Sequence, residues 1–255
     1  MRDKNTKSRN ISSQVQERTK KMERTALKDR KLPSYTKGEE IFNMVTHIVG
    51  GALGAAALVL CVVFSFIEWD AYKIVGSFIY GFSVVMLYTV SSIYHGITPK
   101  ADTAKKVMQI IDHCMIFILI AGTYTPITLG AMRQINAPLA WVVFGFVWGA
   151  SALGITLNAI DIKKYKKFSM ICYLVIGWCA IFTLKSLIEA ITFTGFMFII
   201  LGGISYSIGA ILYSTGHKKG LKYMHSVFHI FVVFGTVLHF FGILFYVILR
   251  GELKA

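Results

Sequence analysis

Seven long apolar runs constrain the fold of this 255-residue sequence more than any other feature. Each run is long enough to cross about 30 Å of hydrocarbon as a helix, because an α-helix rises about 1.5 Å per residue. The runs lie near residues 41–67, 73–95, 110–131, 138–160, 168–190, 193–213 and 224–249. Since the connections are short, we predict an all-α integral membrane protein with one seven-helix transmembrane domain over residues 38–255.

Composition supports the same class. The sequence is 55% hydrophobic and 16% charged, whereas ordinary soluble domains carry about 25% charged residues. A net charge of +14 would suit nucleic acid, but the basic residues gather in the N-terminal tail and in short loops between the apolar runs. Charge placed in this way orients membrane proteins and attracts anionic lipid headgroups. We therefore expect lipid headgroups as partners of the basic loops, and no nucleic acid.

The distribution of lysine and arginine predicts the orientation. One side of the predicted membrane domain carries 22 of the 27 basic residues, in the tail and in the loops 96–107, 161–167 and 214–222. The other side carries only Lys73, Arg133, Lys185, Arg250 and Lys254. By the positive-inside rule the N-terminus is cytoplasmic and the C-terminus lies outside. This places the chain in the cell (cytoplasmic) membrane as a multi-pass protein.

Residues 1–37 form a basic tail that is short of large apolar side chains. The tail has no apolar core of the length that a secretory signal requires, so we expect no cleaved leader. A segment of this composition is expected to stay disordered in the cytoplasm or to lie on the anionic membrane surface.

Two histidines stand at the start of the last apolar run, in the motif His225-Ser-Val-Phe-His229. Residues four apart share one helix face, about 6 Å apart, which is close enough to hold one metal ion. Ionisable groups at the mouth of a membrane helix usually face protein or a cavity. From this motif alone, the alternative is a pair of hydrogen-bonded structural histidines.

Other polar residues recur at the ends of the apolar runs. Successive membrane helices alternate in direction, so the starts of the first, third and seventh helices meet the end of the second at the cytoplasmic face. The residues at these positions are Glu40, Asn43 and His47, then Ser91 and His95, then Asp112, and finally His225 and His229. Four segments remote in sequence are therefore expected to place their polar groups at one depth.

The residue types at this end suit a metal centre. His95, His225 and His229 make a three-imidazole set, which is typical of Zn²⁺ with a fourth position open to water. Asp112 could orient that water, take its proton or fix an imidazole. Ser91 could donate a hydrogen bond to a developing oxyanion, or simply bond back to its own helix.

The first helix offers a supporting set. Glu40, Asn43 and His47 could brace this helix against the site. They could equally be an interfacial acid and two interhelical hydrogen-bonding residues, and we leave them outside the metal set. Pro126 should kink the third helix, because proline lacks the backbone N–H and clashes with the preceding turn.

Three ordered blocks resemble the progestin/adipoQ receptor superfamily, and most closely its bacterial branch, the hemolysin III proteins. The blocks are Glu40-x-x-Asn43-x-x-x-His47, then Ser91-x-x-x-His95 followed by Asp112-His113, and then His225-x-x-x-His229. The stretch from Asp112 to Pro126 is also similar to that branch. Together these blocks extend over all but the tail.

The resemblance implies zinc held by His95, His225 and His229, with Asp112 and Ser91 close to the metal water. It also implies kinship with membrane hydrolases of the alkaline ceramidase type. We therefore predict a zinc-dependent hydrolase of a lipid amide or ester bond. The alternatives are a non-enzymatic protein of lipid homeostasis and a hemolysin-like pore, each with structural zinc.

Overall fold

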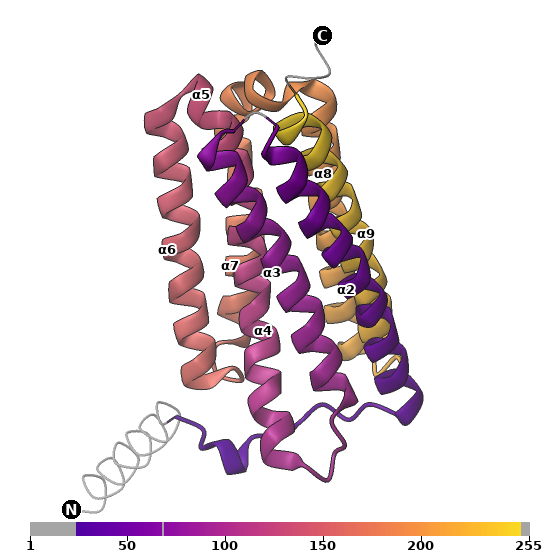
Figure 1. Ribbon diagram of the computed structural model, residues 1–255. Helices are drawn as coiled ribbons and strands as arrows, with labels where there is room; N and C mark the ends of the chain where they lie inside the picture. Colours follow the sequence, from indigo (N-terminus) through magenta and orange to yellow (C-terminus); the bar gives the residue numbers. More distant parts are fainter. Residues whose placement is uncertain (1–23, 68, 251–255) are drawn as a thin grey trace, which may run out of the picture.

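The computed structural model is a bundle of long helices lying side by side (Figure 1). It describes residues 24–67 and 69–250, excluding the side chains of His217 and Lys218. The described part contains no strand. The elements are η1 (3₁₀, Leu27–Asp29), α2 (Lys37–Ser65), α3 (Ala71–Gly96), α4 (Asp102–Thr125), η2 (π, Pro126–Met132), α5 (Arg133–Ile135), α6 (Ala137–Asp161), α7 (Lys166–Trp178), η3 (3₁₀, Cys179–Thr183), α8 (Leu184–Lys218), α9 (Met224–Ile243) and η4 (π, Leu244–Ile248).

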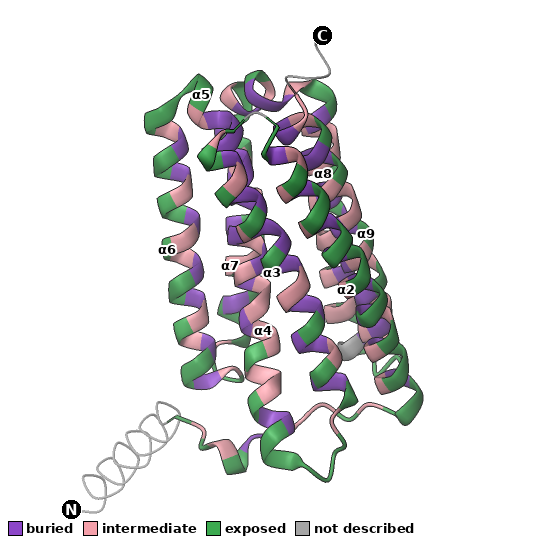
Figure 2. Ribbon diagram, in the orientation of Figure 1, coloured by how far each residue is buried: buried purple, intermediate pink, exposed green. Residues whose placement is uncertain are grey.

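Six helical segments among the described residues are long and apolar enough to cross a membrane. This confirms the predicted class, an all-helical multi-pass membrane protein. The segments are Lys37–Ser65, Ala71–Gly96, Asp102–Ile135, Ala137–Asp161, Lys166–Gly216 and Met224–Ile248. Figure 2 shows exposed residues along the outward sides of α2 and α6 and buried ones toward the interior of the bundle. Exposed apolar side chains such as Val49 and Val142 suit contact with lipid rather than water.

The fifth of these segments, 51 residues long, contains a sharp break at Thr192. This residue has φ 65° and ψ 166°, a backbone conformation that is rare outside glycine. Trp178 precedes Thr192 by almost as many residues as Ser207 follows it. Trp178 Nε1 nevertheless donates a hydrogen bond to Ser207 Oγ at 3.0 Å. The chain therefore folds back at Thr192, between the predicted runs 168–190 and 193–213.

The third helix begins earlier than predicted. The apolar pattern predicts a start near residue 110, with Lys105 and Lys106 in the preceding loop, but α4 starts at Asp102 and includes both lysines. Both are buried, with 2% and 6% of their surface exposed. Lys106 Nζ pairs with the Asp102 carboxylate at 2.6 Å. The prediction that these two lysines lie in a loop was wrong. Hydropathy scores every lysine as polar, including a buried lysine that forms an ion pair with a carboxylate.

Pro126 lies at the boundary between α4 and the π-helical segment η2. Threonine hydroxyls satisfy carbonyl groups around this change of winding. Thr125 Oγ1 donates to Ala121 O, and Thr128 Oγ1 donates to Tyr124 O, both at 2.8 Å. The predicted irregularity is thus a π-helical segment that begins at Pro126, with threonine hydroxyls near its start bonded to carbonyls one turn earlier.

Helices α8 and α9 approach closely along the side that carries the last histidines. A Cβ atom placed on Gly235 would lie 3.0 Å from the Gly202 carbonyl oxygen, so neither helix could come this near with a larger residue there. Polar contacts accompany the close approach, since Ser205 Oγ donates to Phe231 O at 2.7 Å. This packing fixes the position of α9 against α8.

Residues 24–36, which we call the N-terminal strap, run across one end of the bundle to the start of α2 (Figure 1). Thr25 N donates to the Asp161 carboxylate at 2.8 Å, and Arg30 donates to Ile160 O at 2.8 Å. Lys106 Nζ donates to Lys28 O at 3.0 Å. Residues 24–36 of the predicted tail therefore contact the helices, whereas residues 1–23 lie outside the described residues.

Candidate metal centre

One end of the bundle gathers the polar residues that the sequence singled out, and we call it the histidine end. Helices α2, α4 and α9 begin there and α3 ends there (Figure 1). Two contacts tie the start of α2 to that of α9. The Glu39 carboxylate accepts from Tyr223 N at 2.7 Å, and Ser226 Oγ donates to Asn43 Oδ1 at 2.7 Å. The start of α2 is itself fixed by a capping box between Thr36 and Glu39.

Three histidines meet at this end. One ring nitrogen from each of His95, His225 and His229 lies within 4.8 Å of the other two, a grouping that could hold a metal ion. His95 and His229 are buried, with 3% and 2% of their surface exposed. His225 Nε2 and His229 Nε2 are 3.0 Å apart. Two imidazole nitrogens this close share either one proton or a cation between them.

The hydrogen bonds of the histidines leave the right atoms available for a metal. His95 Nδ1 lies 2.6 Å from the Glu40 carboxylate, so it carries the proton if the ring is neutral. His229 Nδ1 is 3.3 Å from Asn43 O. Each contact leaves Nε2 as the free ligand atom, and His95 Nε2 is buried without a hydrogen-bond partner. The three-imidazole set therefore fits a divalent ion such as zinc, whose histidine ligands usually have a second partner of this kind. His95 and His229 have one, whereas Nδ1 of His225 has no hydrogen-bond partner among the described residues.

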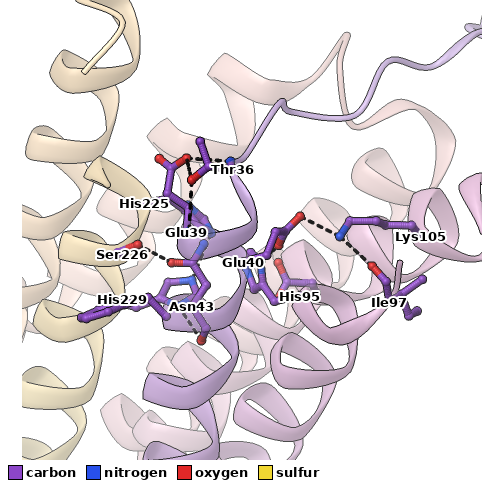
Figure 3. Close-up of polar contacts among 12 residues, drawn as sticks. Thr36, Glu39, Glu40, Asn43, His95, Ile97, Lys105, His225, Ser226 and His229 are labelled. Atoms are coloured by element: carbon purple, nitrogen blue, oxygen red, sulfur yellow. Dashed lines mark hydrogen bonds and ion pairs between the residues drawn. The ribbon is translucent and has the colours of Figure 1, made fainter. Parts of the chain in front are cut away.

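Helix α2 supplies the partners of the cluster (Figure 3). Glu40 bonds to His95, and the backbone of Asn43 faces His229 while its side chain accepts from Ser226. His47 makes no hydrogen bond through either ring nitrogen within the described part of the chain. Its ring instead packs against those of His229 and Tyr88. The structure thus brings Glu40, Asn43 and His47 next to the three histidines of the cluster.

Asp112 and Ser91 lie together beside the histidines. The Asp112 carboxylate, in α4, lies 3.2 Å from His113 Nδ1, and Ser91 lies one turn before His95 in α3. Ser91 is buried, with 2% of its surface exposed. Asp112 is not a member of the group whose donor atoms all lie within 4.8 Å.

Two tyrosines that the sequence motifs do not mark also pack on the cluster. The ring of Tyr35, in the strap, stacks on His225 with centroids 5.2 Å apart and planes 24° apart. Tyr213 meets His225 edge-on at 5.1 Å. Burial raises the pKa of the Tyr35 phenol above its usual range, so the group is neutral. No motif marks Tyr35, because it lies in a segment that reads as a polar tail.

Lys105 is a third residue of the site that the sequence motifs do not mark. Its Nζ lies 2.7 Å from the Glu40 carboxylate and donates to Ile97 O at 2.9 Å. The signal available in the sequence is its spacing, since Lys105 lies seven residues before Asp112 and thus on the same face of α4.

Comparison with known proteins agrees with the blocks that carry the resemblance. A family model described as haemolysin-III related matches residues 35–240. Hemolysin-3 of Bacillus cereus is 36% identical over 211 residues, which cover 82% of this chain and 92% of the relative. The hemolysin-3 homolog of Bacillus subtilis (strain 168) is 37% identical over 212 residues, which cover 83% and 96%.

A human protein is a more distant relative. The monocyte to macrophage differentiation factor of Homo sapiens is 23% identical over 212 residues, covering 80% of this chain and 83% of the relative. The match thus extends beyond bacteria, as the resemblance to the progestin/adipoQ receptor superfamily implies. With more than three quarters of its length matched by the family model, the chain belongs to the haemolysin-III related family of membrane proteins.

Proposed function

We propose that this protein is a zinc-dependent membrane hydrolase that cleaves an amide or ester bond of a lipid. The observation that carries the proposal is the grouping of three imidazoles, each with a ring nitrogen within 4.8 Å of the other two. Hydrolytic zinc sites have three protein ligands and keep one position open. A lipid is the natural substrate because the site lies at one end of a bundle with apolar outer faces.

Each residue then has a definite task. His95, His225 and His229 would hold the ion, while Glu40 and Asn43 fix the rings of His95 and His229. When bound, zinc polarises a carbonyl group and makes water more acidic. The Asp112 carboxylate takes the proton of the attacking water. The Ser91 hydroxyl donates a hydrogen bond toward the scissile carbonyl oxygen, where negative charge develops.

The proposal includes the arrangement in the membrane. We place the histidine end in the cytoplasm, the N-terminus inside and the C-terminus outside the cell membrane. The chain reversal at Thr192 supports two crossings within Lys166–Gly216, which raises the number of crossings to seven. The four lysines of the 161–167 loop, together with Lys219 and Lys222, would then face anionic lipid headgroups.

A second candidate is a protein of lipid homeostasis, or a hemolysin-like pore, in which zinc only ties α3 to α9. Two observations favour it. The ring of Tyr35 covers His225, which closes part of the site. Two relatives at 36% and 37% identity carry the name hemolysin-3 or hemolysin-3 homolog, which refers to lysis and not to hydrolysis.

The test combines metal analysis with a lipid assay. Purified protein in mixed micelles is analysed for zinc and then incubated with lipids that contain one amide or one ester bond. We expect release of a fatty acid from one class, loss of release after chelation and recovery on adding zinc. Bound zinc without turnover of either class would contradict the hydrolase and favour the second candidate.

A further inference from the structure

The carboxylate of Glu40 joins two residues from two other helices (Figure 3). One oxygen lies 2.6 Å from His95 Nδ1 at the end of α3, and the other lies 2.7 Å from Lys105 Nζ in α4. Lys105 also donates to the carbonyl of Ile97, the residue that caps α3. This lysine therefore contacts both the partner of a proposed metal ligand and the helix end that carries that ligand.

Burial of these two charged groups carries a desolvation cost. The side chain of Lys105 is 3% exposed and that of Glu40 is 14% exposed. A buried ammonium group is tolerated only when it is paired and hydrogen-bonded, because its desolvation is costly. The next residue, Lys106, is also buried, but its charge is balanced by a residue of its own helix. It pairs with Asp102 one turn away on its own helix and with the strap carbonyl of Lys28.

We propose that Lys105 is a positioning residue for His95, acting through Glu40. With one carboxylate oxygen held by the ammonium group, the other faces Nδ1 of His95 and keeps the proton there. That leaves the lone pair of Nε2 for the metal. The bond from Lys105 to Ile97 O keeps the ammonium group in place beside Glu40. The inference rests on the metal site of the proposed function.

Adjacent residues provide matched controls for a test. The variants are Lys105→Met, which keeps the apolar stem, and Glu40→Gln, which keeps the shape of the carboxylate. The control for Lys105→Met is Lys106→Met, because Lys106 contacts Lys28 and Asp102 instead of Glu40. The control for Glu40→Gln is Glu39→Gln, because Glu39 contacts Thr36 and Tyr223 instead of His95. Co²⁺ and Zn²⁺ affinities and the absorption spectrum of the Co²⁺ form are measured for each purified variant.

We expect Lys105→Met and Glu40→Gln each to lower metal affinity by roughly 10–100-fold, the usual effect of removing a partner of a ligand. Both should also shift the Co²⁺ spectrum, while the two controls leave it unchanged. Because Lys105 acts through Glu40, the double variant should bind metal about as weakly as Glu40→Gln alone. Lys105→Arg should restore part of the affinity.

Two results would overturn the inference while leaving the zinc site in place. One is wild-type affinity and spectrum in folded Lys105→Met, and the other is a double variant whose losses add. If Lys105→Met does not fold, a Glu40→Gln variant with unchanged affinity and spectrum overturns the inference in the same way. A wild-type protein that takes up neither metal would instead overturn the proposed function, and this inference with it.

Discussion

The imidazole of His47 lies almost parallel to that of His229, with ring centroids 3.6 Å apart and planes 13° apart. His47 also meets the ring of Tyr88 edge-on at 5.0 Å. It comes from α2 and His229 comes from α9, so the stack joins the two helices directly beside the candidate metal centre. Neither nitrogen of His47 has a hydrogen-bond partner among the described residues. His47 therefore joins α2 to α9 through the packing of its ring and not through hydrogen bonds.

The first prediction follows from this stack. His47→Phe should retain the packing, bind zinc normally and melt close to wild type in detergent. His47→Ala should lower the free energy of unfolding by about 2–4 kcal/mol, because it leaves a cavity between α2 and α9. Thermal unfolding and zinc content of both variants check this. Loss of zinc in His47→Phe would show instead that the nitrogens of His47 take part in the metal site.

The second prediction concerns the ligands. Purified protein should hold about one zinc per chain, the content expected of a single three-histidine site. The His225→Ala, His229→Ala double variant should lose it. Removing zinc from wild type should also lower the melting temperature, because the ligands connect α3 to α9.

His239→Ala is the matched control for these ligands. His239 lies in the same helix and is buried, but its Nε2 bonds to Ile199 O at 2.9 Å, away from the cluster. This variant should keep its zinc even if it is less stable. Stoichiometric zinc in the double variant, or its loss in His239→Ala, would contradict the assignment of the ligands.

The third prediction separates catalysis from structure. Asp112→Asn keeps the size of the side chain and removes the base. The variant should keep zinc and fold, but lose lipid hydrolysis by roughly 10²–10⁴-fold, the usual range of general acid–base help. Asp102→Asn, an exposed acid at the start of the same helix, is the control and should retain activity. Unchanged turnover in Asp112→Asn would remove this residue from the mechanism.

The helical class and the family could be predicted from the sequence because both depend on local patterns. Apolar runs of membrane length place α2, α3 and α6 within a few residues of their ends. Alternating helix direction then brings His95 of α3 to the same end as His225 and His229 of α9. Neither argument needs to know how side chains pack.

The neighbours of the cluster could not be predicted in the same way. The sequence places Lys105 in a loop because a lysine lowers hydropathy whether it is solvated or buried against Glu40. It places Tyr35 in a tail because the residues between Arg30 and Thr36 carry too little apolar surface to indicate packing. In both cases the decisive contact is with a residue from another helix, and one-dimensional patterns do not contain it.

The fourth prediction concerns topology. Reporters fused before Met1 and after Ala255 should appear on opposite sides of the membrane, the first inside and the second outside. An odd number of crossings requires this, and the lysines at the histidine end set the direction. Reporters on the same side would show that Lys166–Gly216 does not cross twice, despite the break at Thr192.

The last prediction concerns access to the metal centre. Tyr35 stacks on His225 from the strap, and the strap is held on the bundle by Arg30, whose surface is only 5% exposed. Tyr35→Ala should therefore release zinc to a chelator severalfold faster than wild type. Arg30→Ala should act in the same direction, because it frees the strap from Ile160.

The control for this experiment is Tyr72→Ala. Tyr72 is exposed at the other end of the bundle, where its ring packs on Arg133 at 3.8 Å. Its loss should not change the rate of zinc release. Each zinc-loaded protein is mixed with excess chelator in a stopped-flow instrument, and the rate of zinc release is measured. A rate is needed because the equilibrium zinc content would not distinguish chelator access to the metal from the affinity of the site for zinc. Equal release rates in wild type, Tyr35→Ala and Arg30→Ala would mean that the metal leaves by a path the strap does not cover.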